Sequence, residues 1–309
     1  METLKAYIKK KASDLAVEVV LPLGLNPSHT DYDLMCQLES AILRHAGGYE
    51  RFCVDIPQLL RQAIDEVIDA SRSKRFTLGE LEKTEKTYIG TKVEILLRNH
   101  LDLERGKILD LSIDGIELDI KNTIGINWTI PNEAIGHPCI LIRANETTSR
   151  CSFGIIVIRE EILNKGRNRD QKTTISKAGL INVHWMLLDA PYPKNFWEGL
   201  APETRREIMT PRGGTERLAM LFRLHQRLPI SRLLVQALAQ QKDYMKRLRK
   251  NGGARDILAS EGIALLSGKV HRGLIQKLGL PLCDRDDFIS IRPTGPEQIQ
   301  MLREAGGIE

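Results

Sequence analysis

An unbroken alternation of apolar and polar residues marks one segment of the chain, residues 108–122. Its sequence, ILDLSIDGIELDIKN, has Asp114-Gly115 at the centre. This dipeptide suits a two-residue type I′ turn, because both central positions of that turn need a positive φ. The segment therefore predicts a β-hairpin with its apolar residues on one face and its polar residues on the other.

Other patterns appear on both sides of this hairpin. Before it, apolar residues recur every three or four positions, which is typical of amphipathic helices. After it, short apolar runs predict strands, with one further helix among them. The predicted helices are 33–45, 56–71, 89–99 and 179–188, and the predicted strands are 126–130, 139–143, 153–158 and 288–291.

The last third of the chain is predicted to be a mostly helical domain behind a linker. Three prolines and a glycine lie in 189–202, a composition that interrupts regular structure. Helices are predicted at 215–226, after Ser231 as N-cap, and at 242–251. The last of these would be about 15 Å long, a length that fits the DNA major groove, and 256–266 would form a wing. The pattern favours a helix-turn-helix unit.

Length and composition agree with a folded chain of about two domains. Of the 309 residues, 42% are hydrophobic and 28% are charged, which allows a sizeable core. No run of 18 apolar residues is present, so a membrane-spanning helix is not expected. The five cysteines are widely spaced without a CxxC pair, which favours reduced thiols and a cytoplasmic protein over a disulfide or zinc framework.

Charge is distributed unevenly along the chain, whose formal net charge is +5. Residues 1–195 hold 26 Lys and Arg against 27 Asp and Glu, whereas residues 196–309 hold 19 against 13. A basic C-terminal part beside a neutral N-terminal part points to a polyanionic partner for the former. A solvated basic surface is the alternative.

The polar face of the predicted hairpin carries candidate chemistry. A two-residue turn places Asp110 directly opposite Asp119, with Cβ atoms roughly 5 Å apart. Two carboxylates at that distance repel each other, and a bound divalent cation such as Mg²⁺ would remove the conflict. Lys121 lies on the same face, where an ammonium can hold an attacking water or neutralise a developing charge.

A fourth candidate, Glu94, lies one position away from the apolar stripe of the predicted helix 89–99. Its side chain can therefore point along the edge of the sheet that this helix covers. Together with Asp110 and the Asp119-Ile120-Lys121 triplet, it resembles the PD-(D/E)xK nuclease signature. A surface glutamate and a solvent-facing amphipathic hairpin are the alternative interpretations.

A longer resemblance is to the NaeI family of type II (type IIE-like) restriction endonucleases, and it extends over about 35–292. In the first part of the chain it is carried by KTEKTYIGTKVEILL (83–97), LDIKNT (118–123), WTIPNEAIGHPCILI (128–142) and LNKGRNRDQKT (163–173). In the second part it is carried by MKRLRKNGGARDILASEGIALLSG (245–268) and HRGLIQKLGLP (271–281).

This resemblance implies a fold and an activity. The fold would be of the α+β (α/β) class, with a PD-(D/E)xK restriction-endonuclease-like mixed-sheet domain and a mostly helical winged-helix (helix-turn-helix) domain. The protein would be a homodimeric hydrolase that uses Mg²⁺ to cut double-stranded DNA at a palindrome, stimulated by a second DNA site on its C-terminal domain. Glu94, Asp110 and Asp119 would bind the metal, and Lys121 would be the catalytic lysine. A cognate DNA methyltransferase would accompany the enzyme in a restriction-modification system.

Domain boundaries follow from the linker and from the resemblance. Residues 1–30 are an N-terminal extension of unassigned role, 31–190 the endonuclease domain, 191–204 the linker and 205–309 the winged-helix-like domain. Basic side chains of one loop and of the last predicted helix are the candidate DNA contacts. They are Lys165, Arg167, Arg169 and Lys172 in the loop, and Lys242, Lys246, Arg247, Arg249 and Lys250 in the helix.

Two other functions are compatible with the sequence. One is a winged-helix DNA-binding regulator with an inactive nuclease domain, which would bind DNA without Mg²⁺-dependent cleavage. The other is a DNA-repair nicking endonuclease of the same fold. The recognised base sequence depends on a few side chains whose placement the sequence does not give.

Overall fold

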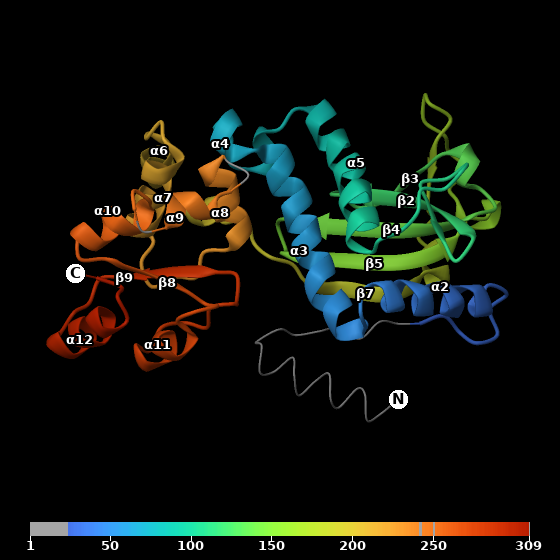
Figure 1. Ribbon diagram of the computed structural model, residues 1–309. Helices are drawn as coiled ribbons and strands as arrows, with labels where there is room; N and C mark the ends of the chain where they lie inside the picture. Colours follow the sequence, from blue (N-terminus) through green and yellow to red (C-terminus); the bar gives the residue numbers. More distant parts are fainter. Residues whose placement is uncertain (1–23, 241–242, 250, 309) are drawn as a thin grey trace. The chain divides into compact units, whose positions relative to one another are not determined.

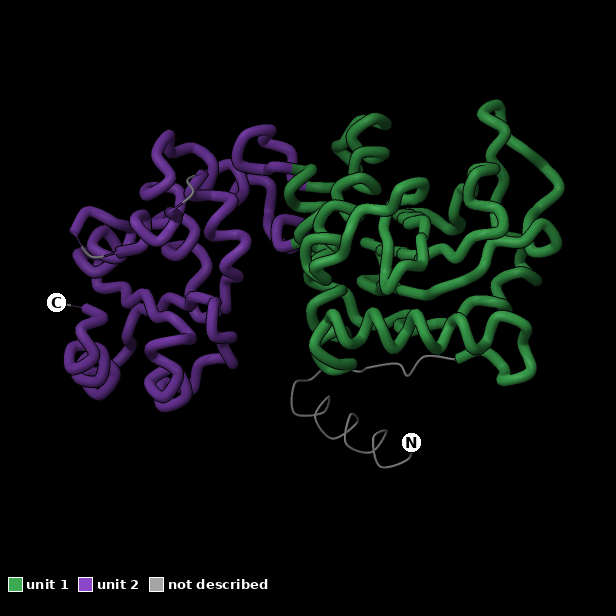
Figure 2. The backbone as a smooth tube through the Cα atoms, turned by 45° about the vertical axis from the view of Figure 1, so that its right-hand side comes forward, with its two compact units in different colours: residues 1–68, 77–195 green, residues 69–76, 196–309 purple. Residues whose placement is uncertain are grey.

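The chain forms two compact units, which Figure 2 shows in different colours. The structure is a computed structural model that describes residues 24–240, 243–249 and 251–308. Unit 1 holds the described residues up to 68 together with 77–195, and unit 2 holds 69–76 together with the residues from 196 onward. Of the predicted N-terminal extension, residues 1–23 lie outside the described residues.

Unit 1 is an α+β unit built on one five-stranded sheet. Its strands β1 (Leu111–Ile113), β2 (Ile116–Thr123), β4 (Pro138–Asn145), β5 (Arg150–Val157) and β7 (His184–Pro191) are arranged in the order β1-β2-β4-β5-β7. Its α-helices are α2 (Tyr32–His45), α3 (Tyr49–Ile68) and α5 (Lys83–His100). Two very short strands, β3 (Thr129–Ile130) and β6 (Thr173–Thr174), pair separately, and 3₁₀ turns occur at Leu78–Glu80, Asn132–Ala134, Glu160–Ile162 and Gly179–Asn182.

The sheet is mixed and is covered on both faces. Strands β2 and β4 run parallel, whereas the other neighbouring pairs are antiparallel. Helices α2, α3 and α5 pack on one face (Figure 1), where Phe52 of α3 meets Phe153 of β5 with ring centroids 5.0 Å apart. A parallel pair needs a crossover connection, and here the β2–β4 connection brings Trp128 over Cys139 and Leu141 on the other face.

The structure confirms the predicted hairpin. Asp114 and Gly115 have φ values of 50° and 81°, as a type I′ turn requires. The register pairs Leu111 with Leu118, as the two-residue turn predicts. The helices predicted at 33–45, 56–71 and 89–99 correspond to α2, α3 and α5, and the strands predicted at 139–143, 153–158 and 288–291 correspond to β4, β5 and β9 (Phe288–Ile291).

The helix predicted at 179–188 is wrong. A single 3₁₀ turn, Gly179–Asn182, is followed by strand β7, which pairs antiparallel with β5. A short apolar run fits a buried strand as well as a helix, and the open edge of β5 decides between them. The strand predicted at 126–130 is reduced to the two residues of β3.

Unit 2 is mostly helical. Its helices are α4 (Ala70–Ser73), α6 (Pro202–Met209), α7 (Gly214–Leu224), α8 (Arg232–Ala239), α9 (Met245–Leu248), α10 (Ala254–Ser260), α11 (Arg272–Lys277) and α12 (Pro296–Glu304), with a 3₁₀ turn at Trp197–Gly199. Strand β8 (Ala264–Ser267) pairs antiparallel with β9, and in Figure 1 helices α11 and α12 lie on one side of this pair. Across the described part of both units, no helix has the length and apolar character needed to cross a membrane.

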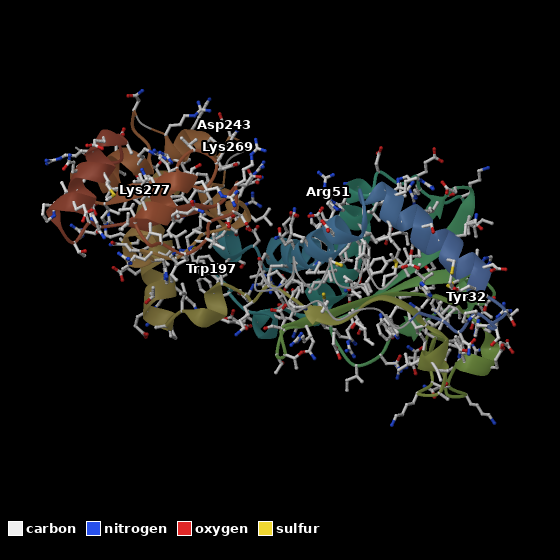
Figure 3. All side chains as sticks on the ribbon, turned by 90° about the horizontal axis from the view of Figure 1, so that it is seen from below. Tyr32, Arg51, Trp197, Asp243, Lys269 and Lys277 are labelled. Carbon is white, nitrogen blue, oxygen red and sulfur yellow. The ribbon has the colours of Figure 1, made fainter. Side chains whose placement is uncertain are left out.

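The segment 69–76 groups with unit 2, although the predicted endonuclease domain spans 31–190. Aromatic packing explains this placement. Phe76 lies on Trp197, which is labelled in Figure 3, with ring centroids 5.1 Å apart. The Arg205 guanidinium lies 5.8 Å from the centroid of the Phe76 ring. No local sequence pattern indicates this exchange.

The long basic helix predicted at 242–251 is wrong. Within the described part of that segment, only Met245–Leu248 is helical. The chain then turns sharply, because Asn251 and Gly252 have positive φ and a Cβ at Gly253 would lie 2.2 Å from the Arg249 carbonyl oxygen. The wing predicted at 256–266 is wrong as well, since α10 and β8 occupy that stretch.

A buried arginine connects two helices of unit 2, α7 and α8. Arg217 of α7 is 6% exposed and is paired with carbonyl groups. Its Nε and Nη2 donate to the Leu238 carbonyl at 3.2 and 3.1 Å, and its Nη1 donates to the Pro211 and Arg212 carbonyls. The last carbonyls of a helix lack partners within the helix, so Arg217 satisfies the C-terminal end of α8 and ties it to the start of α7.

Two glycine substitutions in unit 1 should shift stability in opposite directions. Gly115→Ala should destabilise the protein by about 1–2 kcal/mol, because alanine must then adopt the left-handed region at φ 81°. Gly90→Ala should stabilise it by about 0.5–1 kcal/mol, because Gly90 lies inside α5 with no heavy atom within 4 Å of the place a Cβ would take. Urea unfolding measures both changes, and a Gly115→Ala variant as stable as the parent would contradict the turn assignment.

Candidate active site

Hairpin β1–β2 and the residue that precedes it form the base of the site. Strand β1 begins at Leu111, so the expected Asp110–Asp119 pair lies one position beyond the paired residues. There the side chain of Asp110 replaces a backbone partner, because its Oδ2 accepts a hydrogen bond from the Ile120 N–H at 2.8 Å. The Asp110 carboxylate is therefore held against β2, close enough to Asp119 to influence its protonation.

Asp119 and Lys121 form an ion pair at the centre of the site. Lys121 Nζ lies 2.8 Å from Asp119 Oδ1 and 2.7 Å from Oδ2. Asp119 is only 5% exposed and stands beside Cys139 of β4 in the parallel register. The carboxylate thus has an apolar, fully buried neighbour on one side and an ammonium on the other.

Burial sets the protonation behaviour of this pair. Burial raises the pKa of Asp119 to about 6, with a further contribution from Asp110 and an opposing one from Lys121. For Lys121, burial lowers the pKa, but the hydrogen bond and charge of Asp119 outweigh that effect, so the pKa is raised overall. At neutral pH the site therefore holds an ionised carboxylate and an ionised ammonium.

Glu94 lies at the border of this group. Its Oε1 is 3.7 Å from Arg98 Nη1, one helical turn further along α5. Burial raises the pKa of Glu94, and the negative charge of Asp110 adds to that shift, whereas Arg98 and Lys121 oppose it. The structure therefore brings Asp110, Asp119 and Lys121 together and places Glu94 within their electrostatic reach.

The donor set suits a hard divalent cation. Asp110 and Asp119 offer carboxylate oxygens, the ligands that Mg²⁺ prefers. Asp119 Oδ2 is buried without a well-directed hydrogen bond, although the 2.7 Å distance to Lys121 Nζ neutralises its charge. In residues 24–240, 243–249 and 251–308, no three His, Cys, Asp or Glu side chains stand together as a ready metal-binding group. Since Mg²⁺ often binds through one or two carboxylates with phosphate and water completing its shell, the two aspartates fit it.

The basic loop 165–172 is exposed and has an ordered hydrogen-bond pattern. Asn168 Oδ1 accepts the Lys172 N–H at 2.9 Å, and the Asn168 N–H donates to the Lys172 carbonyl at 2.8 Å. Arg167 donates from Nη1 to the side chain of Asn132. All four predicted basic side chains of the loop face solvent, so they are available to an anionic partner.

The basic loop 165–172 and the two aspartates lie at the same end of the sheet. Strand β5 ends at Val157 opposite Pro138, and Asp119 pairs with Cys139, the next residue of β4. The chain enters the 3₁₀ turn Glu160–Ile162 directly after β5 and then continues into the basic loop. The fold therefore places at one end of the sheet acidic and basic candidates that are more than 40 residues apart in sequence.

The structure describes three of the five basic residues predicted on the last helix of the motif. Lys246, Arg247 and Arg249 are exposed in and directly after α9, whereas Lys242 and Lys250 lie outside the described residues. A helix of four residues is about 6 Å long. It is too short to serve by itself as the groove-reading helix that the sequence predicts.

Unit 2 has further exposed cations that the sequence patterns did not indicate. Lys269 follows β8, and α11 begins at Arg272 and ends at Lys277; Figure 3 labels Lys269 and Lys277. The apolar run at 263–266 followed by these cations is the sequence signal that marks them.

Glu117 also received no role from its sequence position. Its carboxylate accepts three backbone hydrogen bonds, from the N–H groups of Lys107, Ile108 and Leu109, at 2.8, 2.9 and 2.9 Å. Only the tertiary structure reveals this contact, because the donors belong to an irregular loop.

Known proteins match the chain over most of its length. A family model described as "Restriction endonuclease NaeI" matches residues 53–299. The chain is also similar to the "Type II restriction enzyme NaeI" of Lentzea aerocolonigenes, with 32% identity over 244 residues that cover 76% of each chain. The residues matched by the family model include Glu94, Asp110, Asp119 and Lys121.

The side chain of Asp119 should titrate near pH 6. In ¹³C NMR of carboxyl groups, we expect a midpoint of about 6, against an ordinary aspartate value near 4. Because the folded state binds this proton more tightly than the unfolded chain, Asp119 contributes less to stability as pH rises from about 4 to 6. Lys121→Met should move the midpoint upward, since the ammonium lowers this pKa.

Lys83→Met, which removes an exposed cation at the start of α5, is the control and should leave the midpoint in place. The Asp119 resonance is identified by its loss in Asp119→Asn. A midpoint at or below pH 4 in the parent would contradict the buried setting of this carboxylate.

Proposed function

The chain belongs to the NaeI restriction endonuclease family, and we propose that it is a type II restriction endonuclease that cuts double-stranded DNA at a specific palindromic site with Mg²⁺. The observation that carries this proposal is the buried ion pair of Asp119 and Lys121 next to Asp110. Two carboxylates and a lysine at one end of a mixed sheet can serve the metal-assisted hydrolysis of a phosphodiester.

Asp110 and Asp119 would hold the metal ion, with Glu94 as a further carboxylate at the border of the site. When bound, the metal would lower the pKa of a water molecule and polarise the scissile phosphate. Asp119 is suited to this task because, among the residues that the structure describes, Lys121 is the cation that pairs with it, and it would turn toward a cation of higher charge.

Lys121 would then be released from its partner. Its ammonium would hold the attacking water and stabilise the negative charge that develops on the phosphate oxygens. The water would lose a proton to solvent as it adds to phosphorus, the bond from phosphorus to the 3′-oxygen would break, and that oxygen would take up a proton from solvent. The expected products are a 5′-phosphate and a 3′-hydroxyl.

The loop 165–172 would hold the DNA backbone near these groups. Its exposed cations, Lys165, Arg167, Arg169 and Lys172, lie at the end of the sheet that carries the aspartates. Arg and Lys side chains contribute phosphate contacts and read guanine edges in the major groove. Since a palindrome has two-fold symmetry, a homodimer would present one such loop and one active site to each strand.

Unit 2 would bind a second DNA site through a revised helix-turn-helix arrangement. Ser231 caps α8 by accepting the Leu234 N–H at 3.3 Å. Helix α10, rather than the segment predicted at 242–251, would be the second helix of the motif, and β8 and β9 would follow it as in a winged helix. The Ile230 N–H donates to the Phe288 carbonyl at 2.8 Å, which adds a third strand position beside β9 and supports this arrangement.

DNA bound to unit 2 would stimulate cleavage by unit 1, and a cognate DNA methyltransferase would protect the host sites. Two other functions are distinguished by their products. A regulator with an inactive nuclease domain would leave supercoiled plasmid intact in Mg²⁺, and a nicking repair enzyme would stop at the open circle. The proposed enzyme proceeds to linear DNA.

Asp119→Asn should lower the rate of plasmid cleavage by more than about 100-fold, the upper range for loss of an outer-shell group. The amide keeps the size of the side chain but removes the charge that would bind Mg²⁺. DNA binding in Ca²⁺, measured by gel shift, should remain within a few-fold of the parent. Asp33→Asn, on an exposed aspartate in the first turn of α2, should cleave normally. Cleavage by Asp119→Asn at the parent rate in saturating Mg²⁺ would overturn the assignment.

A short uncleavable duplex that carries the recognition site should accelerate cleavage of a one-site plasmid. Coupling between two binding sites is typically worth about 1–3 kcal/mol, or roughly 5- to 150-fold. Arg249→Ala should reduce this stimulation more than basal cleavage, whereas Arg206→Ala, with the same loss of charge on α6, should not. A rate series against duplex concentration measures the effect. A flat or purely inhibitory curve would mean that the duplex only competes with the plasmid.

A further inference from the structure

The Glu117 carboxylate holds the loop that leads into the active site. Glu117 lies on β2, and its side chain reaches back to residues 107–109, ahead of β1. Oε1 accepts the Lys107 N–H at 2.8 Å, and Oε2 accepts the N–H groups of Ile108 and Leu109, both at 2.9 Å. Three consecutive backbone donors therefore converge on one carboxylate, an arrangement that favours a negative charge at their focus.

These hydrogen bonds restrain residues 107–109, where Lys107 and Ile108 are exposed and Leu109 is buried. Ile108 is 82% exposed, so burial of its side chain does not hold the loop in place.

Gly106 gives the same loop its sharp course. A Cβ at this position would lie 2.4 Å from the Leu109 carbonyl oxygen and 3.0 Å from the Leu111 carbonyl oxygen. Any other residue would therefore push the loop away from the start of β1. The close approach at Gly106 and the hydrogen bonds to Glu117 restrain the same stretch independently of each other.

The restrained stretch ends one residue before Asp110. Asp110 Oδ2 accepts a hydrogen bond from the Ile120 N–H at 2.8 Å. This contact depends on where the loop places the Asp110 backbone. We propose that Glu117 is a positioning residue that fixes the 107–109 loop and thereby sets Asp110 in the orientation that binds the metal. This inference rests on the proposed function of the Asp110–Asp119 site.

A carboxylate is needed at position 117 because all three donors are N–H groups. In Glu117→Gln, the side-chain NH₂ replaces one oxygen and faces one or two N–H donors, so at least one of the three hydrogen bonds is lost. Glu297→Gln, on an exposed glutamate in the first turn of α12, is the charge-matched control.

The experiment compares the parent, Glu117→Gln, Gly106→Ala and Glu297→Gln by hydrogen exchange and by Mn²⁺ binding. In the metal-free protein, exchange at the amides of 107–109 and Ile120 should accelerate about tenfold or more in the first two variants. Their dissociation constant for Mn²⁺, from electron paramagnetic resonance, should rise about 10-fold, within the 10- to 100-fold range for loss of an outer-shell partner. The Mg²⁺ concentration for half-maximal cleavage should rise in parallel, and Glu297→Gln should match the parent.

Gly106→Ala tests the effect of the loop's position without changing the charge of the site. Removing a negative charge near the site weakens cation binding by itself, but Gly106→Ala leaves the charge of the site unchanged. Weaker Mn²⁺ binding in both variants supports positioning. The proposal is wrong if Glu117→Gln frees the amides of 107–109 while Ile120 exchange and Mn²⁺ affinity stay at the parent values, or if only the charge-removing variant loses affinity.

Failure of the proposed function has a different signature. In that case the parent itself neither cleaves DNA nor loses Mn²⁺ affinity on Asp119→Asn. The Ile120 amide still reports whether Glu117 sets Asp110, because that readout needs neither metal nor DNA. Unchanged Ile120 exchange in Glu117→Gln overturns the positioning role whatever the activity of the protein.

Discussion

The ion pair between Asp119 and Lys121 is the interaction on which the site depends. A carboxylate that is 5% exposed is costly to ionise unless an opposite charge compensates it. Cys139 and the apolar layer under Trp128 create that burial, and Lys121 compensates for it at 2.7–2.8 Å. The raised pKa of Asp119, about 6, reflects this balance between burial and the charge of Lys121.

Side chains that replace backbone partners shape the rest of the site. Strand β1 is only three residues long, so the backbone ladder ends before it reaches Asp119. Asp110 continues the ladder by accepting the Ile120 N–H, and Glu117 supplies acceptors for the loop ahead of it. An open end of this kind leaves carboxylate oxygens free that a longer strand would have covered.

In the proposed enzyme, acidic and basic residues of the chain would have different roles. Carboxylates repel the phosphates of DNA, so a catalytic site made of acids needs cations that bring the polyanion close. In the proposed enzyme, Lys121 and the loop 165–172 would supply these cations in unit 1, whereas the residues from 196 onward hold 19 Lys and Arg against 13 Asp and Glu. Within unit 2, the charge of Arg217 is paired with carbonyl groups, so exposed cations rather than Arg217 would contact DNA.

The sequence by itself determined the hairpin, its register and the residues of the candidate site, because a two-residue turn and strict alternation leave one register that buries the apolar face. It also determined three helices of unit 1 from their apolar periodicity. Only the tertiary structure decided that 179–188 holds a strand, since β5 offers an open edge there, and that the helix predicted at 242–251 ends at Leu248 before the sharp turn at 251–253. It alone joined 69–76 to unit 2 and placed Glu117 against the 107–109 loop. These features depend on partners distant in the chain or on close backbone contacts, and no local pattern of residues encodes either.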